Sequence, residues 1–387
     1  MAATSVLTSV FKLLLITLLI SQVTPVQSAI LPEDRADVMY HGYDGGGLEV
    51  TGPSVLVRKG FKDKVSVWGN YYVDMISSAS VDVMATASPY DEERTEYSIG
   101  VDYLRGKTFM GLSFTSSEES DYTSNAVRFG ISRDFFGDLT TFGISYARGE
   151  DEVRRSGDDT FAEETTRQSY RVDMSQIITR SLIVNLNYEA ITDEGFLNNP
   201  YRQVRYYDPS IPVLAYSYQA ERYPRTKTSN AAALRAMYYL PYRAALKFEY
   251  RTYSDTWGVD AYNVEVGYTH PFNDRLVVDL KYRFYDQTAA DFYSDLFPFA
   301  DAQNFLARDK ELASFSSQTV GMGVSYELAP DWMPFFKKSA IHFNVDYVQF
   351  DYADFRNVLE VVPDTPGTEG LYSFDSVVLR VFFSVRY

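Results

Sequence analysis

The chain of 387 residues contains no cysteine. This absence excludes disulfide bonds, a lipid-modified N-terminal cysteine, c-type haem attachment and any thiolate metal site on this polypeptide. Histidine is also scarce, and the spacing of His41, His270 and His342 matches no zinc motif. We therefore expect no metal and no other cofactor, and we expect stability to come from backbone pairing and packing.

A catalytic site is equally hard to find in the sequence. His342 and Asn344 would share one face of a strand, as in hydrolases embedded in barrels, but no serine adjoins them. We interpret His342 as a polar wall residue and expect that the protein is not an enzyme.

Basic residues are the minority, with 36 Lys and Arg against 52 Asp and Glu and a formal net charge of -16. Nucleic acid is excluded as a partner because a phosphate backbone requires a basic surface. The acidic residues form short runs between apolar stretches, at 91–93, 118–121 and 150–152, which we expect to lie in solvated loops.

Long apolar runs are missing beyond residue 28, so no transmembrane helix is expected. Residues 1–28 have the pattern of a secretory signal peptide: Lys12, an apolar run at 13–20, and Val26 and Ser28 at the spacing of a cleavage site. The run is shorter than the roughly 20 residues that cross a bilayer. We therefore expect residues 1–28 to be removed and residues 29–387 to form a single exported domain.

Aromatic residues are abundant at 16%, and two-residue alternation runs through almost the whole chain. In residues 64–76, KVSVWGNYYVDMI, one face carries Val65, Val67, Tyr71 and Val73, and the other carries Ser66, Asn70 and Asp74. Such alternation indicates strands with two differently solvated faces. The other runs are 36–43, 48–59, 95–104, 108–115, 125–133, 140–148, 167–175, 182–189, 229–239, 243–251, 262–269, 276–285, 318–327, 340–349 and 375–387.

Connections between these runs alternate between short turns and long loops, the longest loops being about 192–226 and 288–312. This pattern is typical of an outer-membrane barrel with short periplasmic turns and long extracellular loops. We predict an all-β fold, a closed transmembrane antiparallel barrel of sixteen strands, with fourteen as the alternative count. Closure pairs every backbone N–H and C=O group, as hydrocarbon requires.

The last strand ends in VVLRVFFSVRY, and its alternation stops at an aromatic residue. We expect one face of this strand to lie against lipid, with Tyr387 at the inner aromatic girdle. This ending resembles the C-terminal β-signal by which the barrel-assembly machinery recognises outer-membrane proteins. The signal residues are Leu379, Val381, Phe383, Val385 and Tyr387.

Charged residues of both signs fall on the face opposite the apolar one. They predict a polar lumen, which is either a pore lining that sets ion preference or a wall braced by salt bridges. The candidates are Arg171, Asp173, Glu189, Arg235, Lys247, Glu249, Arg251, Glu265, Asp279, Lys281 and Arg283, with Asp346, Arg380 and Arg386 beyond them.

Two long loops are rich in aromatic residues, 195–226 and 291–312. We expect them to fold inward and narrow the channel, because a barrel this wide otherwise passes solutes freely. Arg202, Arg205, Arg222 and Arg225 are the constriction candidates. In the alternative, the loops are exposed and bind lipopolysaccharide or a protein partner.

Several segments resemble the domain-of-unknown-function family 3570 over essentially the whole mature chain. They include MYHGYDGGG (39–47), NYYVDMISSASVDV (70–83), ISRDFFGDLTT (131–141), YEAITDEGFLNNPYR (188–202) and ADFYSDLFPFADAQNFLARDKEL (290–312). The resemblance implies a Gram-negative outer-membrane protein surrounded by lipid and lipopolysaccharide. Members occur beside extracytoplasmic flavin-transfer and thioredoxin-like proteins, which implies a periplasmic redox partner.

Two functions follow as hypotheses. The first is a porin-like channel that passes small hydrophilic solutes. The second is a structural or scaffold barrel of an extracytoplasmic redox or export system, with its lumen filled by its own loops or by a partner protein.

Overall fold

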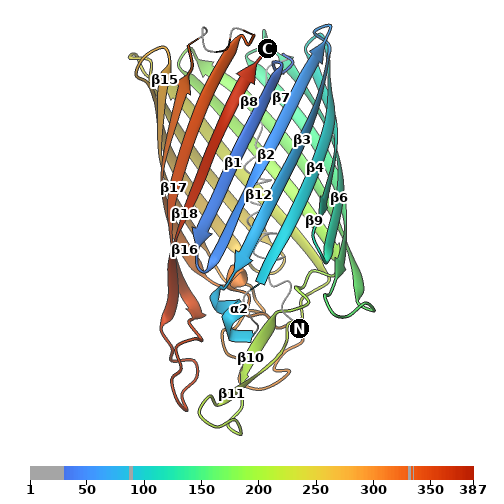
Figure 1. The fold of residues 1–387 in the computed structure, drawn as a ribbon, viewed down its shortest axis with the longest axis vertical. Coiled ribbons are helices and arrows are strands. Elements are labelled where there is room, and N and C mark those ends of the chain that lie inside the picture. Colours follow the sequence, from blue (N-terminus) through green and yellow to red (C-terminus); the bar gives the residue numbers. More distant parts are fainter. Residues whose placement is uncertain (1–29, 87–89, 330–332, 334) are drawn as a thin grey trace.

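The computed structural model describes residues 30–86, 90–329, 333 and 335–387, so the predicted signal peptide at 1–28 lies outside the described residues. Sixteen strands close into one antiparallel barrel, each paired with the next along the chain and β1 paired with β18 (Figure 1). The predicted fold and the count of sixteen are confirmed. The strands are β1 (Arg35–Gly45), β2 (Leu48–Phe61), β3 (Val65–Ser78), β4 (Tyr90–Arg105), β5 (Thr108–Glu118), β6 (Tyr122–Phe135), β7 (Thr140–Arg154), β8 (Ala162–Thr179), β9 (Leu182–Gly195), β12 (Thr226–Tyr239), β13 (Ala245–Asp255), β14 (Asp260–Pro271), β15 (Leu276–Gln287), β16 (Phe315–Glu327), β17 (Lys338–Arg356) and β18 (Leu371–Arg386).

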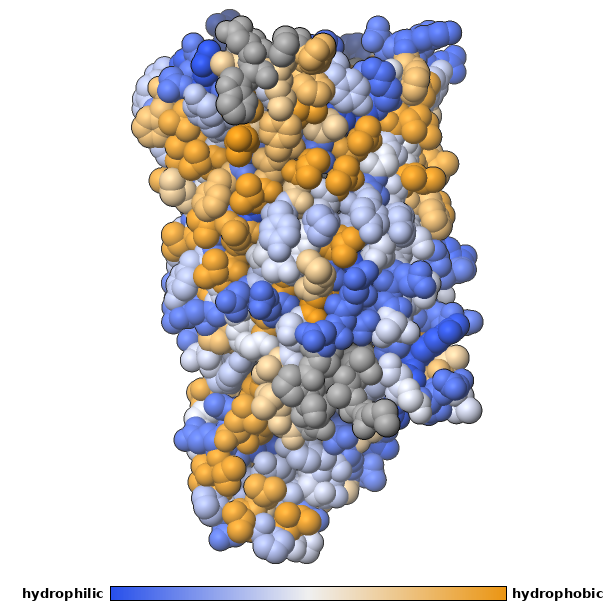
Figure 2. Space-filling model, in the orientation of Figure 1, coloured by the Kyte–Doolittle hydropathy of each residue, from blue (hydrophilic) through white to orange (hydrophobic). Residues whose placement is uncertain are grey.

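The wall has an apolar outer face and a polar inner face. In β15, Leu280 is 50% exposed and Tyr282 is 45% exposed, while Lys281 and Arg283 alternate with them on the other face. Figure 2 shows apolar side chains over the half of the barrel nearer the short turns and hydrophilic ones toward the loop end. A closed sheet with an apolar belt satisfies its backbone within hydrocarbon, which makes this a transmembrane β-barrel of the Gram-negative outer-membrane type. Among the described residues, no helix combines the length and apolar character needed to cross a membrane.

The expected alternation of short turns and long loops is only partly right. At the extracellular end, which carries the long loops, the connections 46–47, 119–121 and 256–259 are also short. Gly46 and Gly47 turn the chain with φ of 59° and 75°. The Asp255 carboxylate accepts hydrogen bonds from the backbone N–H groups of Trp257 (2.9 Å) and Val259 (3.1 Å), which closes the turn after β13.

Additional elements that the sequence pattern did not predict lie at the extracellular end. They are helix α2 (Val81–Thr86), the hairpin β10 (Gln203–Tyr207) and β11 (Tyr216–Ala220), and the 3-10 turn η1 (Lys310–Leu312). Figure 1 shows α2 at the mouth of the barrel and the hairpin extending away from it. Buried hydrophobic clusters also gather at this end, so much of the apolar core of the described chain lies among the loops.

Candidate functional site

The extracellular loops pack together into one structure, here named the loop cap, which consists of α2 and residues 196–225, 256–259, 288–314 and 357–370. Short backbone bridges join the two longest loops, at Tyr206–Phe297 and Arg222–Leu306. The second bridge has both hydrogen bonds: Arg222 N–H donates to Leu306 O (2.9 Å) and Leu306 N–H donates to Arg222 O (2.8 Å). Loop 196–225 therefore pairs directly with loop 288–314.

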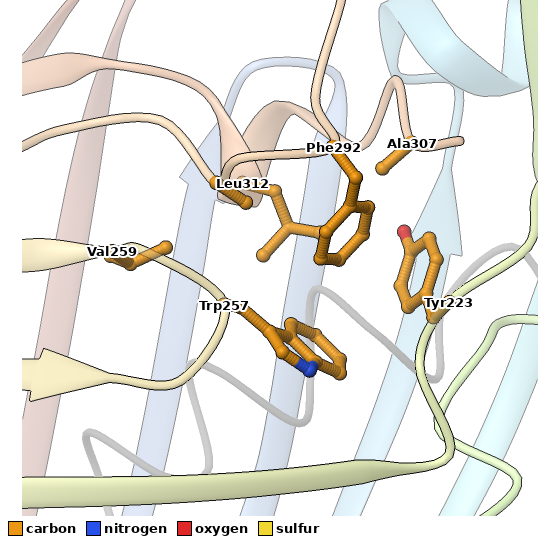
Figure 3. Close-up of a cluster of buried hydrophobic side chains, with 7 residues drawn as sticks. Tyr223, Trp257, Val259, Phe292, Ala307 and Leu312 are labelled. Atoms are coloured by element: carbon orange, nitrogen blue, oxygen red, sulfur yellow. The ribbon is translucent and has the colours of Figure 1, made fainter. Parts of the chain in front are cut away.

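An aromatic cluster holds three of these segments together (Figure 3). Tyr223 from 196–225 contacts Trp257 from 256–259, with ring centroids 5.4 Å apart. Trp257 in turn meets Phe292 from 288–314 at 5.2 Å. Each ring buries a large apolar area, so this cluster is a main source of packing energy in the cap.

A second cluster reaches across the mouth of the barrel. Val81 of α2 belongs to one buried cluster with Ala313, Phe315, Phe355 and Val358. Helix α2 connects β3 to β4, whereas these partners adjoin β16 and β17, and β18, β1 and β2 lie between the two groups in the sheet. Loops from separated parts of the ring are thus joined, and the cap extends over the extracellular opening.

A buried ionic network without surplus carboxylates ties three loops together. The guanidinium of Arg205 donates to both carboxylate oxygens of Glu369, at 2.5 and 3.0 Å, and also pairs with Asp295. Arg308 pairs with Asp295 at 2.9 Å. Burial acts to raise the pKa of Glu369, but the hydrogen bonds and charge of Arg205, together with backbone N–H donors, outweigh it and lower the pKa below its usual value.

A second buried network has an excess of carboxylates. Arg202 pairs with Asp309, and Glu221 accepts hydrogen bonds from Tyr223 Oη (2.6 Å) and from the backbone N–H of Arg308 (2.7 Å). Burial and the nearby charge of Asp309, opposed by Arg202, raise the pKa of Glu221 to about 7. This carboxyl therefore titrates in the range of an ordinary histidine.

The four arginines predicted to form a constriction differ in burial. Arg205 is fully buried and Arg202 is 6% exposed, each enclosed by carboxylates of the cap. The expectation that these two line an open passage is wrong, because their charges are neutralised inside the loops. Arg222 pairs with Asp301 (2.7 Å) and Arg225 with Glu163 (2.6 Å), both at the exposed edge of the cap.

The predicted lumen residues lie on the wall face that alternates with the exposed apolar residues, and most of them are paired. Glu189 accepts a hydrogen bond from Ser169 (2.7 Å). Arg251 and Arg283 have no carboxylate within the 4.0 Å ion-pair limit among the described residues, although Glu265 is the register partner of Arg283. The ion pairs are Arg171–Asp173 (2.8 Å), Arg235–Glu249, Lys247–Asp279 (3.1 Å), Lys281–Asp346 (3.0 Å) and Arg380–Asp346 (2.7 Å).

Gly321 makes one of these pairs possible. It lies in β16 between Lys281 of β15 and Asp346 of β17, in register with both. A Cβ atom at this position would overlap Asp346 Oδ1 and Lys281 Cε. The two side chains therefore meet over a strand that presents no side chain, and Arg380 completes the group from β18.

One inner-wall cluster was missed by the sequence reasoning. His41 Nε2 lies 2.7 Å from Asp74 Oδ1, and the His41 ring stacks on Tyr72 at 4.7 Å. Sequence spacing does not connect the two residues, because Asp74 is 33 residues from His41. The available signal was Gly52, the register partner of His41 in β2, which leaves room for the two side chains to meet across that strand.

The C-terminal residue closes the seam of the barrel. The Tyr387 hydroxyl donates to the backbone carbonyl of Arg58 in β2 (2.9 Å), and Lys59 Nζ lies 5.0 Å from the centre of the Tyr387 ring. Tyr387 thus reaches past β1 to the strand beyond it. Val381 is exposed on the outer face, whereas Val385 is buried, so the expected lipid contact is wrong at Val385.

A closed sixteen-strand barrel with an apolar belt, a polar inner wall and a loop cap defines an outer-membrane β-barrel. The chain belongs to the family described as "Protein of unknown function (DUF3570)", whose model matches residues 66–171 and 158–364. No curated protein matches the sequence.

Several solved structures are similar in fold. One is a bacterial polysaccharide outer membrane secretin, with a TM-score of 0.49 and 8% identity over 92% of this chain and 100% of that chain. Another is a Pseudomonas aeruginosa FadL homologue, with a TM-score of 0.45 and 8% identity over 92% of this chain and 91% of that chain. The P. putida toluene transporter TodX gives a TM-score of 0.43 and 10% identity over 94% of this chain and 93% of that chain.

Proposed function

We propose that the protein is a porin-like outer-membrane channel for small hydrophilic solutes. The observation that carries the proposal is the inner wall, where charged side chains of both signs line a sixteen-strand barrel. A barrel of this size is wide enough for an aqueous passage, and the charges are tolerated only where water or hydrogen bonds surround them. Catalysis forms no part of the proposal.

Single-channel recording in a planar bilayer tests it. Purified mature protein is expected to give discrete conductance steps, with an ion preference that a salt gradient reveals. A folded, heat-modifiable barrel that gives no steps with an intact or a destabilised cap would overturn the channel.

A second candidate is a scaffold barrel whose lumen is occupied. The observation that favours it is the loop cap, which is packed as a protein interior is and spans the mouth. Its occupant would be the loops themselves or a periplasmic redox protein. An electrically silent barrel that retains one periplasmic protein through purification would support this candidate over the channel.

Two further partners accompany both candidates. The apolar belt needs outer-membrane lipid, and we propose that lipopolysaccharide surrounds the hydrophilic outer ends of the strands. We also propose that the barrel-assembly machinery reads the strand that ends at Tyr387.

A further inference from the structure

The two buried networks of the loop cap differ in charge balance. Arg205 and Arg308 pair with Asp295 and Glu369, and the Arg356 guanidinium donates to the backbone carbonyl of Glu369 beside them, so this network has no surplus of carboxylates. In the other network the Glu221–Asp309 pair faces Arg202, the cation whose ion pair joins this site. A buried site with more carboxylates than cations changes its energy when one of them binds a proton.

We propose that the loop cap is a gate over the extracellular mouth, which is closed when the Glu221–Asp309 pair holds a proton and is released when both carboxylates are ionised. The inference rests on the proposed channel function. It assigns to that channel a switch built from loops 196–225 and 288–314.

Groups from three adjoining segments lie around the pair. Within 196–225, the Tyr223 hydroxyl donates to Glu221 Oε2 at 2.6 Å and lies 3.5 Å from Asp309 Oδ2, so it is placed between the two carboxylates. Within 288–314, the N–H of Glu311 donates to Asp309 Oδ1 at 2.9 Å, and the charged residues Lys310 and Glu311 follow Asp309 in η1.

The third adjoining segment is 256–259, which contributes Trp257. Beneath its ring lies Lys227, with Nζ 4.7 Å from the ring centre, and Lys227 is itself paired with Asp255 at 3.1 Å. That pair is balanced and adds no net charge. The Lys227–Asp255 pair therefore does not offset the negative charge of Glu221 and Asp309.

The position of the pair explains why its ionisation would release the gate. Glu221 directly precedes Arg222, whose two backbone hydrogen bonds with Leu306 join the two loops. The Glu221 carboxylate also accepts a hydrogen bond from the N–H of Arg308, two residues beyond Leu306. Repulsion between Glu221 and Asp309 therefore acts at the junction itself. The network around Arg205 keeps loops 196–225, 288–314 and 357–370 attached to one another, so the cap opens only at the Arg222–Leu306 edge and does not unfold.

The test is single-channel conductance of the full mature chain at about pH 5 and about pH 8. These values lie on either side of the raised pKa of Glu221, and each pH unit changes the ratio of protonated to ionised carboxyl about tenfold. We expect open probability to rise several-fold toward pH 8. Glu221→Gln removes the second charge and should keep the channel closed at both values. Glu150→Gln, an exposed acid paired with Arg148, is the matched control and should behave as the unaltered protein does.

A reversible lock makes the test independent of titration. The chain has no cysteine, so Arg222→Cys with Leu306→Cys places a single disulfide across the loop junction. The oxidised variant should stay closed at both pH values and the reduced one should recover its conductance.

The outcomes separate the gate from the channel. Conductance that is the same at both pH values, or that the oxidised lock does not reduce, overturns the gate and leaves the channel standing. A different outcome is that no conductance is seen in the unaltered protein, in the reduced Arg222→Cys, Leu306→Cys variant, or in an Arg205→Ala variant with a destabilised cap. That outcome overturns both the channel and the gate.

Discussion

Arg205 and Glu369 are 164 residues apart in the chain, yet the fully buried guanidinium of Arg205 holds both carboxylate oxygens of Glu369. This contact joins the loop after β9 to the loop before β18. Asp295, which also binds Arg205, brings in the loop between β15 and β16. The Arg205 side chain therefore links three of the loops that cover the barrel.

Arg205→Ala should destabilise the cap and spare the barrel. Removal of one partner leaves the other charges buried without compensation, which costs about 3–5 kcal/mol. Limited proteolysis of the folded protein should then cut within 196–225, while the strands stay protected. Arg222→Ala is the control, because its pair with Asp301 is exposed and contributes about 0–1 kcal/mol. Equal proteolysis of the two variants would show that the buried network does not hold the cap.

The stability of the cap should pass through a maximum near the ordinary pKa of glutamate, about 4.5. The pKa of Glu221 is raised, so its contribution is present below about 4.5 and is lost as the pH rises toward about 7. The pKa of Glu369 is lowered, so its contribution is present above about 4.5 and is lost as the pH falls through the lowered value.

Hydrogen exchange at the amides of Arg222 and Leu306, corrected for intrinsic rates, measures this dependence. In Glu221→Gln, protection of these amides should no longer fall as the pH rises above about 4.5, whereas its loss at lower pH should be unchanged. A profile that the substitution does not alter would place the titrating group elsewhere.

The barrel could be predicted from the sequence because its rule is local. Alternation of apolar and polar residues with a period of two places Leu280 outside and Lys281 inside whatever the neighbouring strand contains. The cap follows no such rule. The sequence marks the arginines of 195–226 as constriction candidates, but their partners lie in loops with no periodicity, so the sequence does not show that Arg205 is buried and Arg222 exposed.

The glycines of the barrel wall also show what the sequence alone does not predict. Gly321 and Gly52 interrupt alternating patterns, but the sequence alone does not show which side chains lie beside them. Their role is visible only when the register places polar side chains beside them: Lys281 and Asp346 on the two sides of Gly321, and His41 beside Gly52. The space beside a glycine is used by side chains from the strands on either side of it, so the sequence of one strand does not show what fills it.

Gly321→Leu should break the ion pair that crosses β16. A leucine side chain would occupy the position of the Lys281 and Asp346 groups, and overpacking of this kind typically costs 1–3 kcal/mol. We expect a lower temperature of heat modification and a changed ion preference in the bilayer. Gly69→Leu is the control, because the nearest atom to its Cβ position is 3.8 Å away. If both variants behave alike, the space at Gly321 is not what maintains the pair.

Arg251→Glu combined with Arg283→Glu should shift ion preference toward cations. Neither arginine has an ion-pair partner among the described residues, so each substitution changes the net charge of the inner wall by two units without orphaning a carboxylate. Reversal potentials in a salt gradient measure the shift. Arg148→Glu tests the outer face, where Arg148 is exposed, and should leave the potential unchanged. An unchanged preference in the double variant of an active channel would show that these side chains do not line the conducting path.

Tyr387→Ala, or deletion of Tyr387, should impair insertion of the barrel into the membrane. The residue ends the strand that resembles an assembly signal, and its side chain fastens β18 past β1 to the carbonyl of Arg58. Tyr387→Phe keeps the ring and loses only that hydrogen bond, worth about 1 kcal/mol, so its yield of folded protein should stay close to normal. The measurement is the heat-modifiable fraction in isolated outer membranes. A normal yield from Tyr387→Ala would mean that the terminal aromatic residue contributes to the closed seam but is not read during assembly, whereas a loss shared equally by Tyr387→Phe would assign the effect to the hydrogen bond with Arg58.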